Sequence, residues 1–512
     1  MPFISRTRKG PAPSGWRTAR RLALLAALIL WLAVAAWETH KPLMAGAHIE
    51  SPWYPQAAQD VTFIADITSA DAYGRTVMSQ GIFDQTLAVI RSARRFIVLD
   101  YFLLDERLGS AAAPASPARN LSGELRDALL EQRRAFPDLQ VLLITDPIND
   151  VYGGSPSPDL TLIRAAGVSV VVTDLNALRD SNFMYSSLWR LAISWWSGTG
   201  RGGGWLPNPL DEESAPITFA SWARLVNFKA NHRKVVIADD GRGGLIGVVG
   251  SANPHDASSA NSNAALKLRG AVLQPLLDSE LAIAHSSGWK GQVPEADAVP
   301  VAKNRHDRLL GAEDLRAQVL TEGAIRSAIL QRVSASGRGD NIDIAMFYVA
   351  DRGIVESLLA ASRRGVKVRL ILDPNQDAFG HPKSGIPNQP VASELVAASD
   401  GAIHVRWYRT HGEQFHTKLV MVYDAHTLWL TLGSANLTRR NIADYNLEAN
   451  VSVETPRTTA LSAQLLDYFD TLWSNRAGLG IEYTADFGFY ADPSQLHYWL
   501  YRLMEGTGLS TF

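Results

Sequence analysis

The segment NHRKVVIAD, residues 231–239, places a histidine and a lysine two positions apart at the start of an apolar run. Residues 415–424, FHTKLVMVYD, repeat this arrangement. Each copy is followed by the same four letters, GSAN, at 250–253 and 433–436. Because the two copies keep their polar residues while most of their apolar residues differ, the repeat indicates a duplicated functional element.

On a β-strand, residues i and i+2 project from the same face, so each histidine points the same way as its lysine. The apolar residues that follow predict a buried strand, in which an imidazole and an ammonium are costly unless they meet partners or face a cleft. A single such pair is more often an ordinary polar strand end. The candidate site residues are His232, Lys234 and Asn253 in the first copy and His416, Lys418 and Asn436 in the second.

Other segments are duplicated in the same order along the chain. VLLITDPINDVYGG (141–154) and RLILDPNQDAFG (369–380) share the pattern D-P-x-x-D-x-aromatic-G. Each follows a helix-like segment and precedes a further strand and then the His-Lys strand. This alternation predicts two similar α/β halves, at 60–295 and 305–485, followed by an aromatic tail at 486–512.

The first half is longer because of a tryptophan-rich insertion near 180–222. Two interpretations are open: a helix packed on the core, or an element that contacts the membrane interface or acyl chains, where tryptophan is enriched. The C-terminal segment SQLHYWLYRLME (494–505) raises the same alternatives. In the insertion, the residues at helical spacing are Leu188, Leu191, Ala192 and Trp195, with Trp189, Trp196 and Trp205 nearby.

Residues 1–45 combine a basic tail with the uncharged run LALLAALILWLAVAAW at 22–37. As a helix this run covers about 24 Å, slightly less than a hydrocarbon core of about 30 Å. We favour a retained signal anchor over a signal peptide cleaved near AGA at 45–47. In both cases the arginine and lysine excess keeps the N-terminus in the cytoplasm and predicts a periplasmic or extracellular catalytic region.

The overall composition is that of a globular protein, with 46% hydrophobic and 20% charged residues. A formal net charge of −2 gives no general attraction to nucleic acid. The chain contains no cysteine, which excludes disulfides, thiolate metal sites and a cysteine nucleophile. Length alone allows two domains or two fused halves.

Two histidines, two lysines and two asparagines around one point suit a phosphodiester. The lysines would neutralise the non-bridging oxygens, and the asparagine amides would bind charge that grows in the transition state. One neutral histidine would attack phosphorus, while the other would protonate the leaving oxygen and then deprotonate the acceptor. We expect no metal or other cofactor, because the lysines already supply the cations and would repel a metal ion.

At these residues the chain resembles the phospholipase D superfamily, whose mark is two copies of HxKxxxxD followed by a GSxN-type turn. The resemblance covers most of residues 60–475. It implies a pseudo-dimer of two α/β sandwich halves, one active site at their interface, and a phosphohistidine intermediate. The motif residues without a proposed reacting role are Asp239 and Ser251 in copy one and Asp424 and Ser434 in copy two.

The second copy departs from the family pattern, because Tyr423 occupies the Asp position and the acid follows at Asp424. Seven residues from the histidine is the opposite strand face, so we expect the family Asp to be structural. The family also places an acidic residue near each GSxN turn to hold a histidine. By equal spacing, we expect Glu448 to hold His416, while its counterpart in the first half is Ala265.

The resemblance further implies that His232, in the first motif, is the nucleophile. Membrane anchoring and the tryptophan-rich insertion favour a phospholipid substrate, with hydrolysis as in a phospholipase D or transfer as in a cardiolipin synthase. The alternatives are a nuclease of the same family and, less favoured, an inactive binding protein. The expected partners are a phospholipid and the membrane, and nucleic acid is not expected; the sequence does not indicate the oligomeric state.

Overall fold

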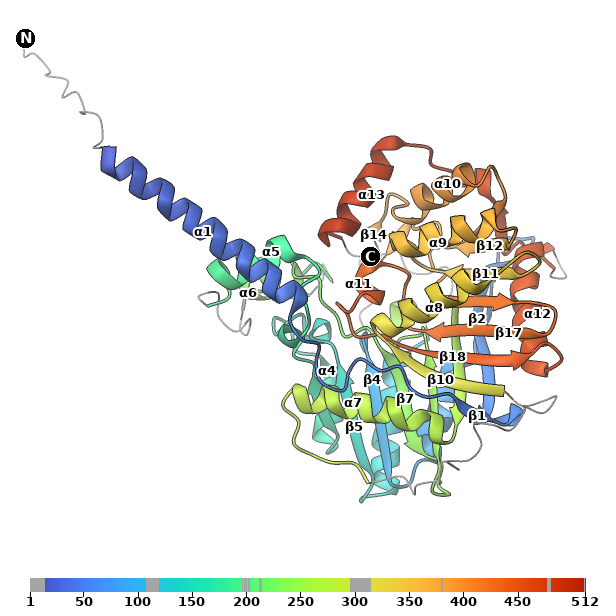
Figure 1. Ribbon diagram of the computed structural model, residues 1–512. Coiled ribbons are helices and arrows are strands. Elements are labelled where there is room, and N and C mark those ends of the chain that lie inside the picture. Colours follow the sequence, from blue (N-terminus) through green and yellow to red (C-terminus); the bar gives the residue numbers. More distant parts are fainter. Residues whose placement is uncertain are drawn as a thin grey trace, which may run out of the picture.

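The computed structural model describes residues 14–106, 119–195, 197, 200, 203–210, 214–294, 315–378, 381–476, 480–510 and 512. Trp196 and most of the expected boundary between the halves lie outside these residues. The described chain forms two sheets with helices on their outer faces and one long helix that projects away from them (Figure 1).

The first half forms an eight-stranded sheet in the order β3-β2-β9-β8-β7-β4-β5-β6. β4 pairs in parallel with β5 on one side and antiparallel with β7 on the other. Its strands are β2 (Val61–Ala70), β3 (Thr76–Ser79), β4 (Phe96–Tyr101), β5 (Gln140–Thr145), β6 (Ser169–Val172), β7 (Lys234–Asp239), β8 (Leu245–Gly250) and β9 (Asn263–Arg269).

The second half forms a nine-stranded sheet in the order β1-β10-β18-β17-β16-β11-β12-β15-β19. Its strands are β1 (Tyr54–Gln56), β10 (Leu315–Thr321), β11 (Asn341–Met346), β12 (Lys367–Leu372), β15 (Ile403–Tyr408), β16 (Lys418–Tyr423), β17 (Thr427–Gly433), β18 (Ala449–Pro456) and β19 (Thr484–Asp486). A separate two-stranded pair consists of β13 (Asp377–Ala378) and β14 (His381–Pro382).

Seven strands follow the same order in both sheets. β2-β9-β8-β7-β4-β5-β6 in the first corresponds to β10-β18-β17-β16-β11-β12-β15 in the second. The two His-Lys segments lead into equivalent central strands, β7 and β16. The predicted α/β fold with two similar halves is confirmed, and β1 and β19 are additions at the two edges of the second sheet.

Most helices cover the outer faces of the sheets, whereas those at 274–286 and 460–474 pack into the core between the sheets. Several helices begin at polar caps that the sequence supplies. The Asn120 side chain accepts a hydrogen bond from the Gly123 amide, and Asp351 accepts one from the Ile354 amide. On the first half lie α2 (Ile82–Ser92), α3 (Leu121–Ala135), α4 (Pro158–Ala165) and α7 (Gln274–Ser286); on the second lie α8 (Gly323–Ala335), α9 (Arg352–Arg363), α10 (Asn388–Ala398), α11 (Arg439–Ile442), α12 (Ala460–Ser474) and α13 (Gln495–Thr507).

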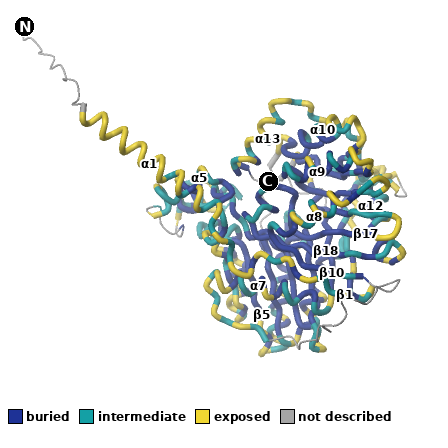
Figure 2. The backbone as a smooth tube through the Cα atoms, viewed as in Figure 1, coloured by how far each residue is buried: buried dark blue, intermediate teal, exposed yellow. Residues whose placement is uncertain are grey.

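The inner faces of the two sheets pack against each other in one shared core. Val98 of β4 belongs to this core together with Leu419 of β16. The next residue along β4, Leu99, points to the outer face and packs under the helices of the first half. Because alternate residues of the strands are used on opposite faces, the central strands are buried throughout (Figure 2).

The first helix, α1 (Ser14–His40), extends beyond the uncharged run at both ends. Within Gly15–His40, an 18-residue window has a mean hydropathy of 2.0, and the helix is long and apolar enough to cross a membrane. Most of α1 is exposed (Figure 2), which distinguishes it from a core helix of the same composition. The helix is therefore a candidate membrane anchor.

The tryptophan-rich insertion packs on the C-terminal part of α1. It contains α5 (Phe183–Leu188), a π-helical turn (Trp189–Ile193) and, at its end, α6 (Phe219–Leu225). Trp31 of α1 donates to the Met184 carbonyl at 3.2 Å, and Arg190 forms an ion pair with Glu38 at 3.1 Å.

The interpretation of the insertion as a helix packed on the core is wrong. Leu188 and Trp195, two residues of the expected apolar face, are exposed, whereas Trp189 is buried. The helix gives way to a π-helical turn after Leu188, so the spacing of an α-helix does not continue to Trp195. The insertion packs on α1 instead. The spacing of apolar residues within one segment does not show which distant segment it contacts.

Candidate active site

His232 and His416 lie two residues before the first residues of the equivalent strands β7 and β16. At each histidine, a backbone hydrogen bond joins the two halves. The His232 amide donates to the Leu447 carbonyl at 2.9 Å. The His416 amide donates to the Ser262 carbonyl at 2.8 Å. Each histidine is therefore attached to the opposite half, and both are buried, with 9% and 8% of their surface exposed.

The imidazole of His232 is held by a carboxylate from the second half. Its Nδ1 lies 2.9 Å from Oε1 and 3.0 Å from Oε2 of Glu448. The expectation that Glu448 holds His416 is wrong, because the orienting contacts cross between the halves. Glu448 also accepts hydrogen bonds from Ser434 and Asn441, so its own position is fixed.

The imidazole of His416 is held by an amide from the first half. Its Nδ1 lies 3.1 Å from Oδ1 of Asn263, and Ser251 donates to the same oxygen at 2.8 Å. Asn263, not Ala265, is thus the counterpart of Glu448. The chain from Asn253 to Asn263 is two residues shorter than the chain from Asn436 to Glu448, and this difference misaligned the two segments when they were compared by equal spacing.

The two lysines and two aromatic rings complete a matching arrangement around the histidines. Lys234 Nζ donates to the His232 carbonyl at 2.6 Å, and Lys418 Nζ donates to the His416 carbonyl at 2.8 Å. The centroid of the Phe102 ring lies 5.0 Å from the centroid of the His232 ring and 5.2 Å from Lys234 Nζ.

In the second half, the Phe347 ring lies 5.0 Å from the His416 ring and 5.3 Å from Lys418 Nζ. Phe102 and Phe347 directly follow β4 and β11, and sequence analysis missed both. The signal was available, because the segments LDYF and IAMF end at the same letter when the duplicated strands are aligned.

Burial and mutual repulsion disfavour positive charge throughout this cluster. Burial, and then Lys234 and Lys418, lower the pKa of His232 well below its usual range. Burial and the same two lysines do so for His416. Burial lowers the pKa of Lys234 to about 7 and that of Lys418 well below its usual value. Because the lysines of both halves act on both histidines, the two motifs form one electrostatic site.

Burial acts in the opposite direction on the carboxylate, raising the pKa of Glu448 to about 7, while Lys234 lowers it. A bound phosphodiester would add negative charge beside the lysines and histidines. Such an anion favours their protonated forms, so the site is suited to an anionic ligand.

The two asparagines of the GSAN turns, Asn253 and Asn436, are buried. Asn253 Oδ1 accepts a hydrogen bond from the Leu103 amide at 3.3 Å. Asn436 Oδ1 has no hydrogen-bond partner among the described residues. The side chains of the serines in the same turns hold the orienting groups, Asn263 and Glu448. The backbones of Ser434 and Ser251 in addition hydrogen-bond His232 and His416, respectively.

The Asp of the first motif fixes a turn far from the reacting groups. Asp239 accepts hydrogen bonds from the backbone amides of Arg94, Arg95 and Phe96 at 2.8–3.0 Å. Tyr423 stands at the equivalent place in the second half and donates to Asp343 at 2.8 Å. These contacts agree with the expectation that the family Asp is structural.

Asp424 and its counterpart Asp240 cap equivalent turns. Asp424 accepts from the His426 and Thr427 amides at 2.6 and 2.7 Å. Asp240 accepts from the Arg242 and Gly244 amides at 2.8 and 2.9 Å. Both acids belong to the turn that joins the His-Lys strand to the next strand.

Two buried aspartates support the segments that carry the histidines. Asp146 accepts from the Asn231 amide at 2.7 Å, and Asp373 accepts from the Phe415 amide at 2.7 Å. Burial raises the pKa of each to about 7. Sequence analysis identified both in the repeated D-P pattern but did not connect them with the site.

A buried arginine between His232 and Lys234 braces the other side of the strand. Arg233 forms ion pairs with Glu280 at 3.1 Å and with Glu322 at 2.7 Å. Glu322 also accepts from the Glu448 amide at 3.1 Å. The second half has Thr417 at this position, so the brace exists only in the first half, and the repeat gave no signal for it.

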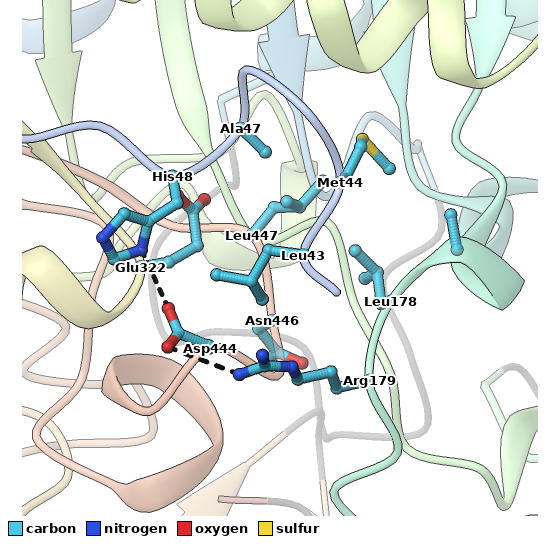
Figure 3. A pocket seen from close by; sticks show the side chains of 11 residues that line it. Leu43, Met44, Ala47, His48, Leu178, Arg179, Glu322, Asp444, Asn446 and Leu447 are labelled. Atoms are coloured by element: carbon cyan, nitrogen blue, oxygen red, sulfur yellow. Dashed lines mark hydrogen bonds and ion pairs between the residues drawn. The ribbon is translucent and has the colours of Figure 1, made fainter. Parts of the chain in front are cut away.

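A hollow of about 290 Å³, open solvent included, lies beside the brace (Figure 3). In Figure 3, Asp444 accepts from His48 and faces Arg179, at 3.0 and 3.6 Å. Residues of the segment after α1 line the hollow together with Leu447, the residue before Glu448. His232 and His416 do not line it, so we do not assign it to the substrate.

Three comparisons with known proteins bear on this site. Residues 329–473 match the family model described as "Cardiolipin synthase, PLD-like domain". No protein in the curated collection matches the chain.

Solved structures with a similar arrangement include phosphatidylserine synthase of Haemophilus influenzae Rd KW20, with 12% identity, a TM-score of 0.48, and coverage of 89% of this chain and 94% of that one. Nuc of Salmonella typhimurium, described as a phospholipase D family member, has 20% identity and a TM-score of 0.25, and the match covers 33% of this chain and 97% of Nuc.

The matched segment 329–473 contains the whole second copy of the repeat, from the strand before the D-P pattern to Glu448 and beyond. The first half has the same order of seven strands and equivalent lysine and phenylalanine contacts around its histidine. The resemblance to the phospholipase D superfamily drawn from the repeated motif is confirmed for residues 329–473, the part of the chain that matches the PLD-like domain.

Proposed function

We propose that the chain is a membrane-anchored phosphatidyl-transferring enzyme that acts through both histidines. The observation that carries this proposal is the reciprocal orientation of the rings: Glu448 of the second half holds His232, and Asn263 of the first half holds His416. Because each Nδ1 faces its orienting group, Nε2 is the ring nitrogen that reacts in the proposed mechanism. Two such nitrogens beside two lysines provide the nucleophile, the acid and the charge that phosphodiester cleavage needs.

In the first step, Nε2 of His232 forms a bond to phosphorus while the bond from phosphorus to the leaving oxygen breaks. His416 gives its proton to that oxygen, which leaves as an alcohol. The phosphorylated ring of His232 is positively charged, with its Nδ1 proton directed to Glu448, so the carboxylate balances the new charge. The assignment of nucleophile to His232 follows the family pattern.

In the second step, His416 takes a proton from water or an alcohol as that molecule attacks phosphorus. The bond from phosphorus to His232 breaks, and the product leaves. Lys234 and Lys418 neutralise the non-bridging oxygens, and the Asn253 and Asn436 amides bind them as hydrogen-bond donors. Water gives phosphatidic acid and an alcohol acceptor gives an exchanged phospholipid; phosphatidylglycerol as acceptor would give cardiolipin.

A phospholipid substrate is favoured by the candidate membrane helix α1 and by the family description of the matched domain. Anchoring would confine the enzyme and its substrate to the same surface, which raises the rate of encounter. The basic residues before α1 would retain the N-terminus in the cytoplasm, so we place the catalytic region on the other side of the membrane.

The test uses purified full-length protein in detergent with phosphatidylglycerol or phosphatidylethanolamine, each with and without added glycerol or ethanol. Products are identified by mass spectrometry. We expect phosphatidic acid, exchanged phosphatidyl alcohols or cardiolipin from the wild type and none from His232→Ala or His416→Ala. The matched control is His404→Ala, which changes an exposed histidine on β15 and should retain activity.

Equal inactivity of the wild type and the variants on every lipid would contradict the proposal. Plasmid DNA, assayed for nicking with the same variants, is the comparison substrate. Cleavage of DNA that requires both histidines, without activity on lipid, would identify the nuclease alternative instead.

A further inference from the structure

Helix α13, near the C-terminus, presents an apolar face to solvent. Leu496, Trp499, Leu500 and Leu503 are 75%, 62%, 40% and 59% exposed. Their spacing of three and four residues places them along one side of the helix. Four large apolar side chains in one row form a continuous surface, unlike the scattered exposed apolar residues of an ordinary protein surface.

The opposite face fixes α13 firmly to the second half. Tyr501 is fully buried, and its hydroxyl accepts from Arg352 at 2.7 Å and donates to Glu394 at 3.1 Å. Glu505 accepts from the Arg439 amide at 2.6 Å. The helix begins at the capping side chain of Ser494. The row of apolar residues is therefore held outward by a well-anchored helix.

The end of α13 contacts the insertion that packs on α1. Gly508, with a positive φ of 74°, lies so close to the Ser181 backbone that a Cβ atom would collide with it. Arg439 donates both to the Ser181 carbonyl and to the Glu505 carbonyl, at 3.4 Å each. The candidate anchor, the insertion and α13 thus form one connected structure.

The direction of α13 relative to α1 suits a membrane surface. In Figure 1, α13 runs across the direction of α1 and lies on the side of the molecule from which α1 projects. If α1 crosses a bilayer, α13 extends along the bilayer surface, which is the orientation of interfacial amphipathic helices. Trp499 supplies the residue type that favours the boundary between lipid and water.

We infer that α13 is an interfacial helix that seats its row of Leu496, Trp499, Leu500 and Leu503 in the surface of the bilayer that holds α1. The inference rests on the membrane anchoring in the proposed function. A bilayer is preferred to a protein partner because α1 would hold α13 next to the lipid permanently, at a high effective concentration. Seating would also fix the catalytic half relative to the lipid surface.

The seated helix is close to the reacting groups through a short chain of contacts. α13 packs against α11 through Arg439 and Glu505. Asn441, also in α11, donates to Glu448, which holds His232. Three contacts therefore connect α13 with the orientation of a proposed catalytic histidine.

The absence of native cysteine allows site-specific labels in the full-length chain. Single variants Trp499→Cys and Leu503→Cys carry an environment-sensitive fluorophore on α13. Asp467→Cys, on the exposed side of α12, is the control away from the proposed surface. Leu28→Cys, on α1, reports whether the anchor is inserted. All four proteins are reconstituted into phosphatidylglycerol and phosphatidylcholine vesicles, with and without brominated acyl chains.

We expect the labels at 499 and 503 to shift to shorter wavelength and to lose fluorescence with brominated lipid, whereas the label at 467 does neither. Quenching at 28 but not at 499 or 503 would overturn the inference and leave the anchor intact. A lack of quenching at 28 as well as on α13 would contradict both the inference and the proposed anchoring. A blue shift on α13 without quenching would mean that protein covers the helix, which also overturns the inference.

Discussion

The two halves have the same construction but orient their histidines with different groups. In both, an aspartate supports the segment before the histidine, a lysine follows it and a phenylalanine packs against it. His232, however, faces the carboxylate of Glu448, whereas His416 faces the amide of Asn263. The residues that build the site are duplicated, and the residues that control charge in it are not.

This difference separates two tasks of the orienting group: to fix the tautomer of the histidine and to stabilise its positive charge. Both Glu448 and Asn263 accept a hydrogen bond from Nδ1 and so fix the reactive tautomer. Only Glu448 also stabilises a positive ring. Under the proposed mechanism, the carboxylate is on the side where the phosphorylated imidazole carries its charge.

The largest expected effect comes from removal of either ring. His232→Ala and His416→Ala should each lower kcat by about 10³-fold or more, since nucleophile and acid–base catalysis are lost. Because the two act as a unit, the double variant should be little worse than either single variant. The measurement is phosphatidic acid or phosphatidyl alcohol formation over time. Losses that multiply in the double variant would show that the two motifs work independently.

Replacement of the Glu448 carboxylate by an amide should give His232 the same kind of Nδ1 partner that His416 has. In Glu448→Gln the amide oxygen still accepts from Nδ1, so we expect a loss in kcat of about 10²-fold, less than the roughly 10⁴-fold of a triad Asp→Asn change that yields the wrong tautomer. Asn263→Asp is the matched variant, and it should move the pH dependence of kcat/KM upward because a carboxylate favours protonated His416. Unchanged pH dependence in Asn263→Asp would remove the proposed distinction between the halves.

A third comparison concerns stability at the position where the motifs diverge. Asp239→Ala removes the acceptor for at least three backbone amides and should lower the free energy of unfolding by about 3 kcal/mol or more. Tyr423→Phe loses one hydroxyl contact with Asp343 and should cost about 1 kcal/mol. Chemical denaturation in detergent measures both. Similar losses would mean that the tyrosine has taken over the full role of the aspartate.

A fourth comparison tests a feature in which the halves agree. Burial raises the pKa of Asp146 and Asp373 from 3.8 to about 7. Between these values the folded chain keeps a proton that the unfolded chain has lost, so this part of the stability is complete below pH about 4 and disappears as the pH rises through about 7. The free energy of unfolding of Asp146→Asn and of Asp373→Asn should therefore fall less over this range than that of the wild type.

The check is denaturation at a series of pH values, with the difference from the wild type plotted against pH. Asp127→Asn, at an exposed position, is the control and should follow the wild type. A response in only one of the two buried positions would show that the supporting aspartates are not equivalent.

The sequence predicted the features that depend on local pattern and repetition. The two HxK segments predicted two buried strands with their polar ends together, and β7 and β16 begin at Lys234 and Lys418. The order of the duplicated segments predicted two similar halves. Phe102 and Phe347 were within reach of the same alignment, since each follows the duplicated strand directly.

Other features depend on contacts between distant segments, which no pattern within one segment contains. Glu448 was identified but given to the wrong histidine, because the pairing crosses between halves. Asn263 was missed because the first half has two fewer residues in the connection after its GSAN turn. The insertion was misjudged because its partner is α1, more than a hundred residues earlier in the chain.

The reciprocal hold on the histidines has a consequence for biosynthesis. Glu448, which holds His232, lies 216 positions after it in the chain. At translation rates of about 5–20 residues per second, the ribosome needs roughly 10–40 s to cover that distance. Under the proposed function, the nascent first half therefore has its histidine unoriented, and catalysis begins only when nearly the whole chain has been made.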